Sequence, residues 1–318
     1  MRSHDQRGTP VVLDTDIGGD PDDSIALAAA ARAVPELALV ITNDETGGDV
    51  GHGQRARFAR LLLDRLGRPD VAVVAGHGSG GTRYFCAGPL VPDTVPGQPT
   101  DVVSVVRGLL EASDGIVRWV GIGAFSNLAR VIDEIPWAGR RLRVTQMGGA
   151  LNYRDPSRAE HNIRMDVPAA HRVFRAVREG GLEDLHLITS DVTFSPEIEV
   201  TRQSRLYALL GEEATGWGGL LRDHLDLWFD SFHPGSMQHD ALTLAAALRK
   251  TFVRLHLSTV ELDELGRMSL SPTGADVWLS ASAEYELCNR WLEKVLTSTT
   301  ESTFRGDPPL SGIGERWT

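Results

Sequence analysis

The sequence predicts an α/β fold in which a mostly parallel central sheet is flanked by helices. Short apolar runs rich in β-branched residues alternate with longer amphipathic segments, which indicates strands alternating with helices. Strands connected in this way form right-handed crossovers and a parallel sheet covered on both faces. A hydrophobic content of 42% and a charged fraction of 24% are typical of a globular protein with a sizeable core.

Six apolar runs are expected to be strands. They cover residues 11–13, 37–42, 71–74, 116–120, 142–145 and 185–189. Helices are expected after Ser24, over residues 54–66 and between most later strands. Residues 195–234 lose this rhythm and carry several aromatic side chains, Trp228 among them. That segment is either a helical insertion that covers a site or a set of core helices.

Length and composition predict one domain over residues 1–318, with a core at about 11–296 and terminal extensions at 1–10 and 297–318. The net charge of −11 argues against a surface for nucleic acid or an anionic membrane. Two cysteines, Cys86 and Cys288, are too few for a disulfide framework. Without an apolar run long enough for a membrane span, a cytoplasmic protein is expected.

The first predicted strand runs into a dense group of carboxylates. Five fall within ten residues: Asp14, Asp16, Asp20, Asp22 and Asp23. Such charges repel one another, and burial at a strand end would raise their pKa values unless a cation were present. Ca²⁺ and Mg²⁺ prefer oxygen ligands, so a divalent metal or catalytic site is predicted. The alternative is that Asp22 or Asp23 only caps the following helix.

Other predicted strands also end in polar or glycine-rich segments, where open α/β sheets bind their ligands. The second ends at Asn43-Asp44-Glu45, and later ones end at residues 121–127 and 147–150. Further on, His239-Asp240 stands at the head of an apolar helix. Asp240 is either a helix cap or part of a site assembled from distant segments.

In their order and spacing these segments resemble the inosine–uridine nucleoside hydrolases. The resemblance rests on residues 14–18 with Asp22-Asp23, Asn43, and residues 123–129, 147–150, 160–162 and 237–242. It extends from residue 11 to about 296. It implies a calcium-dependent N-ribosyl hydrolase on a mostly parallel, Rossmann-like open sheet, with a nucleoside as substrate and often a homodimer or homotetramer as the assembly.

The resemblance also implies a metal centre. Asp16, Asp23 and Asp240 match side-chain ligands of Ca²⁺, and the backbone carbonyl of Ile122 matches another ligand. Asp14 would brace the loop. Asp16 or a neighbour would act as the base toward a water whose pKa the cation lowers.

A second group of residues is implied to bind the substrate. Asp22 and Asn162 match residues that hold the ribose 2′- and 3′-hydroxyls, Asn43 matches a sugar-pocket Asn, and Glu160 matches a residue that binds the 5′-hydroxyl. His239 matches the acid that protonates the leaving base in purine-cleaving members. Carboxylates around the sugar would favour an oxocarbenium-like transition state.

The sequence departs from the family pattern at two places. Gly19 and Asp20 lengthen the first loop, so Asp20 either supports the metal site or only extends the turn. Residues 152–159 leave open which residue meets the 5′-hydroxyl. Arg154 or Arg158 in that segment would admit a charged 5′ substituent, or else is merely solvated.

Two other function classes compete with the hydrolase. A phosphatase of the haloacid dehalogenase type would use Asp14 as nucleophile, Asp16 as acid and Mg²⁺ as cation. A non-catalytic nucleoside- or ribose-binding protein would keep the site without turnover. The phosphatase does not explain Asp22-Asp23 or residues 237–240, and base preference is left open by the sequence.

Overall fold

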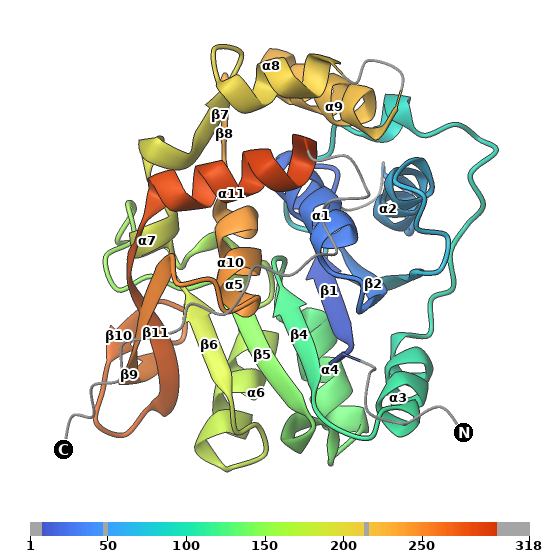
Figure 1. The fold of residues 1–318 in the computed structure, drawn as a ribbon. Helices are drawn as coiled ribbons and strands as arrows, with labels where there is room; N and C mark the ends of the chain where they lie inside the picture. The colour runs from blue at the N-terminus through green and yellow to red at the C-terminus, as the bar shows by residue number, and fades with distance from the viewer. Residues whose placement is uncertain (1–7, 47–49, 213–215, 298–318) are drawn as a thin grey trace, which may run out of the picture.

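The computed structural model describes residues 8–46, 50–212 and 216–297 of the chain. Its centre is a nine-stranded sheet with the strand order β10-β9-β11-β6-β5-β4-β1-β2-β3 (Figure 1). The seven strands from β11 to β3 pair in parallel, and helices connect most of them. The predicted mostly parallel α/β fold is therefore confirmed.

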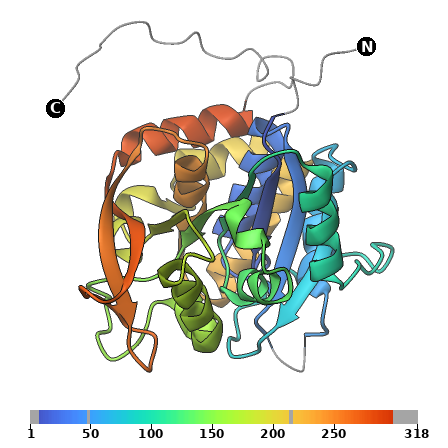
Figure 2. The same ribbon diagram turned by 90° about the horizontal axis from the view of Figure 1, so that it is seen from below.

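All six predicted strands are present. They are β1 (Val11–Thr15), β2 (Leu37–Asp44), β3 (Ala72–Gly78), β4 (Val117–Gly121), β5 (Leu142–Met147) and β6 (Leu185–Ile188). Three further strands were not predicted: β9 (Val253–Leu262), β10 (Met268–Leu270) and β11 (Ala275–Ala283). Strand β9 pairs antiparallel with both β10 and β11. They form one edge of the sheet (Figure 2), and β9 is largely accessible, so it lacks the continuous apolar run of a central strand. A separate two-stranded sheet pairs β7 (Glu199–Thr201) with β8 (Gly235–Met237).

Helices cover both faces of the sheet. They are α1 (Asp22–Ala33), α2 (Gln54–Arg65), α3 (Val102–Ala112), α4 (Ser126–Glu134), α5 (His161–Met165), α6 (Val167–Arg178), α7 (Ser190–Thr193), α8 (Arg205–Glu212), α9 (Trp217–Ser231), α10 (His239–Ala247) and α11 (Tyr285–Thr297). Val11 and Leu13 of β1 join the core that includes α1 and α10, while Val12 joins the core that includes α4 and α6. This alternation is the period of two expected for a strand buried on both faces.

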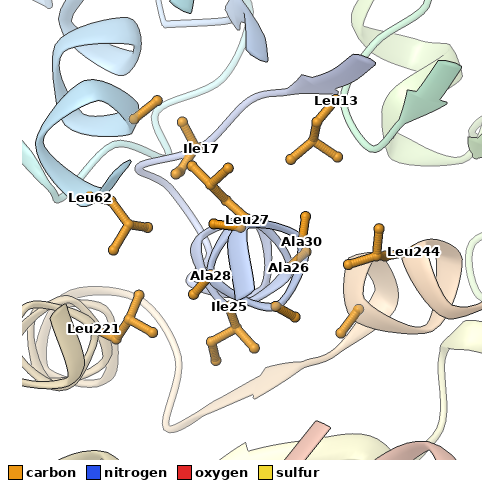
Figure 3. Close-up of a cluster of buried hydrophobic side chains, with 14 of the residues drawn as sticks. Leu13, Ile17, Ile25, Ala26, Leu27, Ala28, Ala30, Leu62, Leu221 and Leu244 are labelled. Carbon is orange, nitrogen blue, oxygen red and sulfur yellow. The ribbon is translucent and has the colours of Figure 1, made fainter. Parts of the chain in front are cut away.

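Helix α1 lies at the centre of the first core. Its residues from Asp22 to Ala31 are all buried, as expected for a helix that is apolar around most of its circumference. Figure 3 shows Leu62, Leu221 and Leu244, from α2, α9 and α10, arranged around it. The packing on all sides fixes the position of the α1 N-terminus and of the carboxylates there.

The order of the strands places a crevice between β1 and β4. The chain runs from β1 outward to β2 and β3, and then returns to the other side of β1 with β4. Asp14 pairs in register with Gly121 across this boundary. In open α/β sheets ligands bind at such a reversal point, outside the carboxyl ends of the strands.

The segment over residues 195–234 contributes helices to the core and also a side chain to the wall of a cavity. Helices α8 and α9 lie side by side at the top of Figure 1. Leu221 and Leu225 of α9 belong to the first core, whereas Trp228 also lines the cavity described below. The predicted terminal extensions fall outside the described residues, apart from residues 8–10 and 297. No helix among the described residues is both long and apolar enough to cross a membrane.

Candidate functional site

A cavity of about 430 Å³ lies beyond the carboxyl ends of β1, β4 and β5. It brings together most of the predicted site residues, and those in its wall come from four separate parts of the chain. Those in its wall are Asp16, Asp22, Asp23, Ile122, Glu160, Asn162, His239 and Asp240. Asp14 and Asn43 lie behind this wall, where both are almost fully buried.

Three carboxylates from the first turns of α1 and α10 converge in the cavity. Asp22, Asp23 and Asp240 each place an oxygen within 4.8 Å of the other two. Asp16, predicted to join Asp23 and Asp240, forms a second group with Glu45 and His161, in which one ligand atom of each lies within 4.8 Å of the other two. Two sets of candidate metal ligands therefore lie at the cavity, with Glu45 of the second set buried outside its wall.

Neither helix that carries these carboxylates uses them as caps. The N-cap of α1 is Pro21 and that of α10 is Gln238, and no side chain caps either helix. Asp23 Oδ1 instead accepts hydrogen bonds from Thr15 Oγ1 and from the backbone N–H of Asp16. The capping alternative therefore does not account for Asp23 or Asp240.

Burial makes these carboxylates hard to ionise as they stand. It raises the pKa of Asp23 to about 6 and that of Asp20 to about 7, and it places the pKa values of Asp16, Asp22 and Asp240 well above their usual range. The carboxylates add to this effect by mutual repulsion. An all-oxygen donor set that needs positive charge fits a hard divalent cation such as Ca²⁺.

One buried arginine supports the loop between β1 and α1. The Arg55 guanidinium donates to the carbonyls of Asp16 and Ile17 and, at 2.9 Å, to that of Tyr84. These hydrogen bonds fix the conformation of the loop. The charge of Arg55 acts at longer range and partly offsets the rise in the pKa values of Asp16 and Asp23. Sequence reasoning missed Arg55, because a lone arginine at the start of a helix carries no distinctive signal.

Asp14 lies in a network of its own beneath the cavity. Its Oδ1 accepts hydrogen bonds from Asn127 Nδ2 at 2.8 Å and from Asn43 Nδ2 at 3.0 Å, and burial raises its pKa to about 8. This position suits the predicted bracing role. It does not suit the nucleophile of a phosphatase, which would have to face the cavity. Asn43 also bonds to the carbonyl of Ala124, so it supports Asp14 from behind the wall.

Glu160 and Asn162 are fixed at the start of α5. Glu160 caps this helix, and its Oε2 accepts from the N–H groups of Gly149 and Asn162 at 3.0 Å each. The Asn162 amide donates to the carbonyls of Ile122 and Met147 at 3.1 and 3.2 Å. Glu160 and Asn162 therefore form a rigid polar rim next to the carboxylates, beside the carbonyl predicted to bind the metal.

Aromatic side chains form another part of the cavity wall. The ring of Tyr84 meets those of Trp228 and Phe232 edge-on, with centroids 5.7 and 5.4 Å away. Trp228 donates its indole N–H to the carbonyl of Gly235, which fixes the orientation of its ring. Flat apolar surfaces of this kind can stack on a nucleobase.

His239 and Arg154 lie together on this cavity wall. Phe194 stacks on His239 with a centroid distance of 6.3 Å, and the Arg154 guanidinium lies 4.8 Å from the centroids of both Phe194 and Tyr153. Burial, with a smaller effect of Arg154, lowers the pKa of His239 to about 4. Arg158 does not reach the cavity and lies in a separate hollow that includes Asp263.

Glu45, His161 and Asp20 complete the polar part of the site. Glu45 and His161 were not predicted as site residues, although Glu45 directly follows Asn43-Asp44 at the end of β2 and His161 stands between two predicted ones. The polar strand end was the signal that could have found Glu45. Asp20 lines the cavity and accepts a hydrogen bond from Ser236, so the lengthened loop adds a carboxylate to the site.

Comparison with known proteins agrees with this arrangement. The family model described as inosine-uridine preferring nucleoside hydrolase matches residues 11–294. The pyrimidine-specific ribonucleoside hydrolase RihA of Shewanella woodyi is 25% identical over 292 residues, which cover 84% of this chain and 88% of that protein.

Solved structures share the fold at lower identity. A plant nucleoside hydrolase superposes with a TM-score of 0.75 at 20% identity, covering 92% of this chain and all of that one. A type III effector protein complexed with adenosine diphosphate ribose superposes with a TM-score of 0.70 at 20% identity, covering 92% of this chain and 94% of that one. The family match spans the strands, the cavity and the carboxylates, and the chain therefore belongs to the inosine-uridine preferring nucleoside hydrolase family.

Proposed function

We propose that this protein hydrolyses the N-glycosidic bond of ribonucleosides to the free base and ribose, with Ca²⁺ as its cofactor. The observation that carries the proposal is the convergence of Asp22, Asp23 and Asp240 in a cavity that also has an aromatic wall. Carboxylates suit a ribosyl cation and its hydroxyls, whereas aromatic rings suit a planar base. Membership of the family and the similarity to a ribonucleoside hydrolase support this substrate class.

The proposed roles divide the cavity into two parts. Asp22 and Asn162 hold the ribose 2′- and 3′-hydroxyls, and Glu160 lies on the same rim for the 5′-hydroxyl. Asn43 and Asp14 stabilise the carboxylate loop from behind. As the bond from C1′ to the base nitrogen breaks, the electron pair leaves with the base, and the nearby carboxylates stabilise the positive charge that develops on the ribosyl ring.

Asp16, Asp23, Asp240 and the Ile122 carbonyl are the proposed cation ligands. When bound, Ca²⁺ would orient the ribose hydroxyls and lower the pKa of a water molecule. Asp16 accepts the proton of the attacking water, whose oxygen forms the new bond at C1′. His239 is the proposed proton donor to the departing base from the other side of the cavity. Burial lowers its pKa to about 4 in the free protein, so this role requires the charge that develops on the departing base to favour the protonated imidazole.

A substrate panel tests this proposal directly. Purine and pyrimidine nucleosides are incubated with the protein, and reducing sugar and free phosphate are measured with and without a chelator. Release of reducing sugar that stops on chelation and returns with Ca²⁺ is expected. Phosphate release from esters alone would contradict the proposal, and binding of nucleosides without turnover would favour the non-catalytic alternative.

We also propose a role in nucleoside salvage in the cytoplasm, carried out by a homodimer or homotetramer. The oligomeric state follows from the family resemblance. Light scattering coupled to size-exclusion chromatography would test it, because a monomeric mass near 34.6 kDa would contradict the proposal.

A further inference from the structure

Glu45 carries a buried oxygen that no N–H or hydroxyl group in the described structure satisfies. Its side chain is 0% exposed, directly beyond the end of β2. The Oε2 atom lies 3.2 Å from His161 Nε2, whereas no N–H or hydroxyl group of the described residues donates to Oε1. A protonated Asp16 carboxyl is a further hydrogen-bond partner of the Glu45 carboxylate, and a cation between the two would replace that proton. A buried carboxylate oxygen without a donor or a cation costs substantial free energy, so this atom needs a ligand.

The other oxygen of Glu45 is held by a chain of hydrogen bonds. Arg164 Nη2 lies 3.2 Å from His161 Nδ1, and Arg164 Nη1 is anchored on the carbonyl of Ala159 at 2.8 Å. Since a guanidinium only donates, Nδ1 must accept, and the imidazole proton is then on Nε2 and points at Glu45. The chain from Arg164 through His161 fixes the Glu45 carboxylate and leaves Oε1 free.

The Glu45 carboxylate lies next to a predicted metal ligand. One ligand atom each of Asp16, Glu45 and His161 lies within 4.8 Å of the other two. Asp16 and His161 both line the cavity, and Asp16 donates its backbone N–H to Asp23 Oδ1. The Glu45 group therefore adjoins the set formed by Asp22, Asp23 and Asp240. Ca²⁺ takes six to eight oxygen ligands. The aspartates would supply fewer than this if each gave one oxygen.

We propose that Glu45 is a further carboxylate ligand on the Asp16 side of the cation site, and that His161 is the positioning residue that orients it. The inference rests on the proposed Ca²⁺ site and adds a ligand to it. Ligating carboxylates are commonly oriented by a hydrogen bond from a neighbouring side chain, as His161 provides here. Asp44 also has a buried oxygen without a partner among the described residues, so what distinguishes Glu45 is its place in the group with Asp16 and His161.

Calcium titration calorimetry on the full chain tests the role of Glu45. The Glu45→Gln variant keeps the size and one acceptor but removes the charge, and a loss of Ca²⁺ affinity of about 10- to 100-fold is expected. Asp44→Asn is the matched control, because Asp44 is an adjacent buried carboxylate whose Oδ2 accepts from the Gly53 N–H at 2.8 Å and which belongs to neither ligand group. Its affinity should match that of the wild type.

Melting temperatures separate ligation from a structural role. Without metal, Glu45→Gln should melt at or below the wild-type temperature, because His161 and Arg55 lower the pKa of Glu45 and so stabilise its charged form in the fold. The Ca²⁺-induced rise in the melting temperature should shrink in this variant. Unchanged Ca²⁺ affinity in Glu45→Gln would overturn the inference, whatever its melting temperature. Should that variant not fold, His161→Gln decides: an affinity loss on the order of 10-fold supports the inference, and no loss overturns it.

The wild-type titration distinguishes the two proposals. A wild-type chain that binds no Ca²⁺ contradicts the proposed cofactor and the inference together. A wild-type chain that binds Ca²⁺ and a Glu45→Gln variant that binds it equally well contradict the inference alone.

Discussion

His239 Nδ1 lies 2.7 Å from the hydroxyl oxygen of Thr193, a contact that joins α10 to α7. The contact fixes the orientation of the imidazole in the cavity wall, and Nε2 makes no hydrogen bond to the described residues. Nε2 is therefore the nitrogen available to a departing base. The distance makes Thr193 the residue that sets the geometry of the proposed acid.

The first prediction is that His239→Ala lowers turnover of ordinary nucleosides by about 10²- to 10⁴-fold, the usual contribution of general acid catalysis. A riboside with a p-nitrophenol leaving group should be largely spared, because p-nitrophenolate departs without protonation. Steady-state kinetics on both substrates provide the measurement. Equal losses on the two would mean that His239 maintains the site and does not protonate the base.

The second prediction is that the protein binds about one Ca²⁺ per chain and that Asp23→Asn loses metal and turnover together. The Asp23 carboxylate belongs to the group with Asp22 and Asp240, and it also accepts hydrogen bonds from Thr15 and from the Asp16 backbone. Removing its charge therefore weakens the metal site and also disturbs the loop that carries Asp16. Elemental analysis and activity measured on the same sample would test this. Zinc in place of calcium, or a variant with full metal content, would count against it.

The third prediction concerns the sugar. If Asp22 and Asn162 bind the 2′- and 3′-hydroxyls, 2′-deoxynucleosides should be poor substrates, because a site built to bond a hydroxyl is left with unpaired polar groups when the hydroxyl is missing. We expect kcat/KM for uridine to exceed that for 2′-deoxyuridine by at least about 10²-fold. Similar values for the two substrates would refute the assigned roles.

The fourth prediction is that the metal-free protein loses stability as the pH rises. Burial raises the pKa of Asp14 to about 8 and that of Asp20 to about 7, from an ordinary value of 3.8. Between about pH 4 and 8 the folded chain keeps protons that the unfolded chain releases, so the free energy of unfolding falls with increasing pH in this window.

Urea unfolding in the presence of a chelator provides the measurement for this effect. The free energy of unfolding should be lower at pH 8 than at pH 5 by more than about 2 kcal/mol. The Asp14→Asn variant keeps an acceptor for Asn127 and should show a smaller pH dependence. Added Ca²⁺ should reduce the difference in the wild type. A flat profile without metal would show that these carboxylates ionise freely in the fold.

The sequence alone determined the alternation of strands and helices, and it predicted eight of the residues that line the cavity. Val11 to Leu13 form a buried strand because apolar β-branched residues suit a sheet covered on both faces, and such local preferences are encoded within a few residues. The strands β9 and β11 escaped prediction because cross-strand pairing, absent from a local pattern, stabilises them.

Only the tertiary structure decided how the carboxylates divide into groups. Asp16 and Asp22 are equally acidic in the sequence, yet Asp22 joins Asp23 and Asp240 while Asp16 joins Glu45. This division depends on the conformation of the turn between β1 and α1 and on how α1 is buried. Neither can be predicted from the spacing of the aspartates in the sequence. Glu45 became a site residue for the same reason: its one free oxygen is set by a hydrogen bond from His161, more than a hundred residues away in the chain.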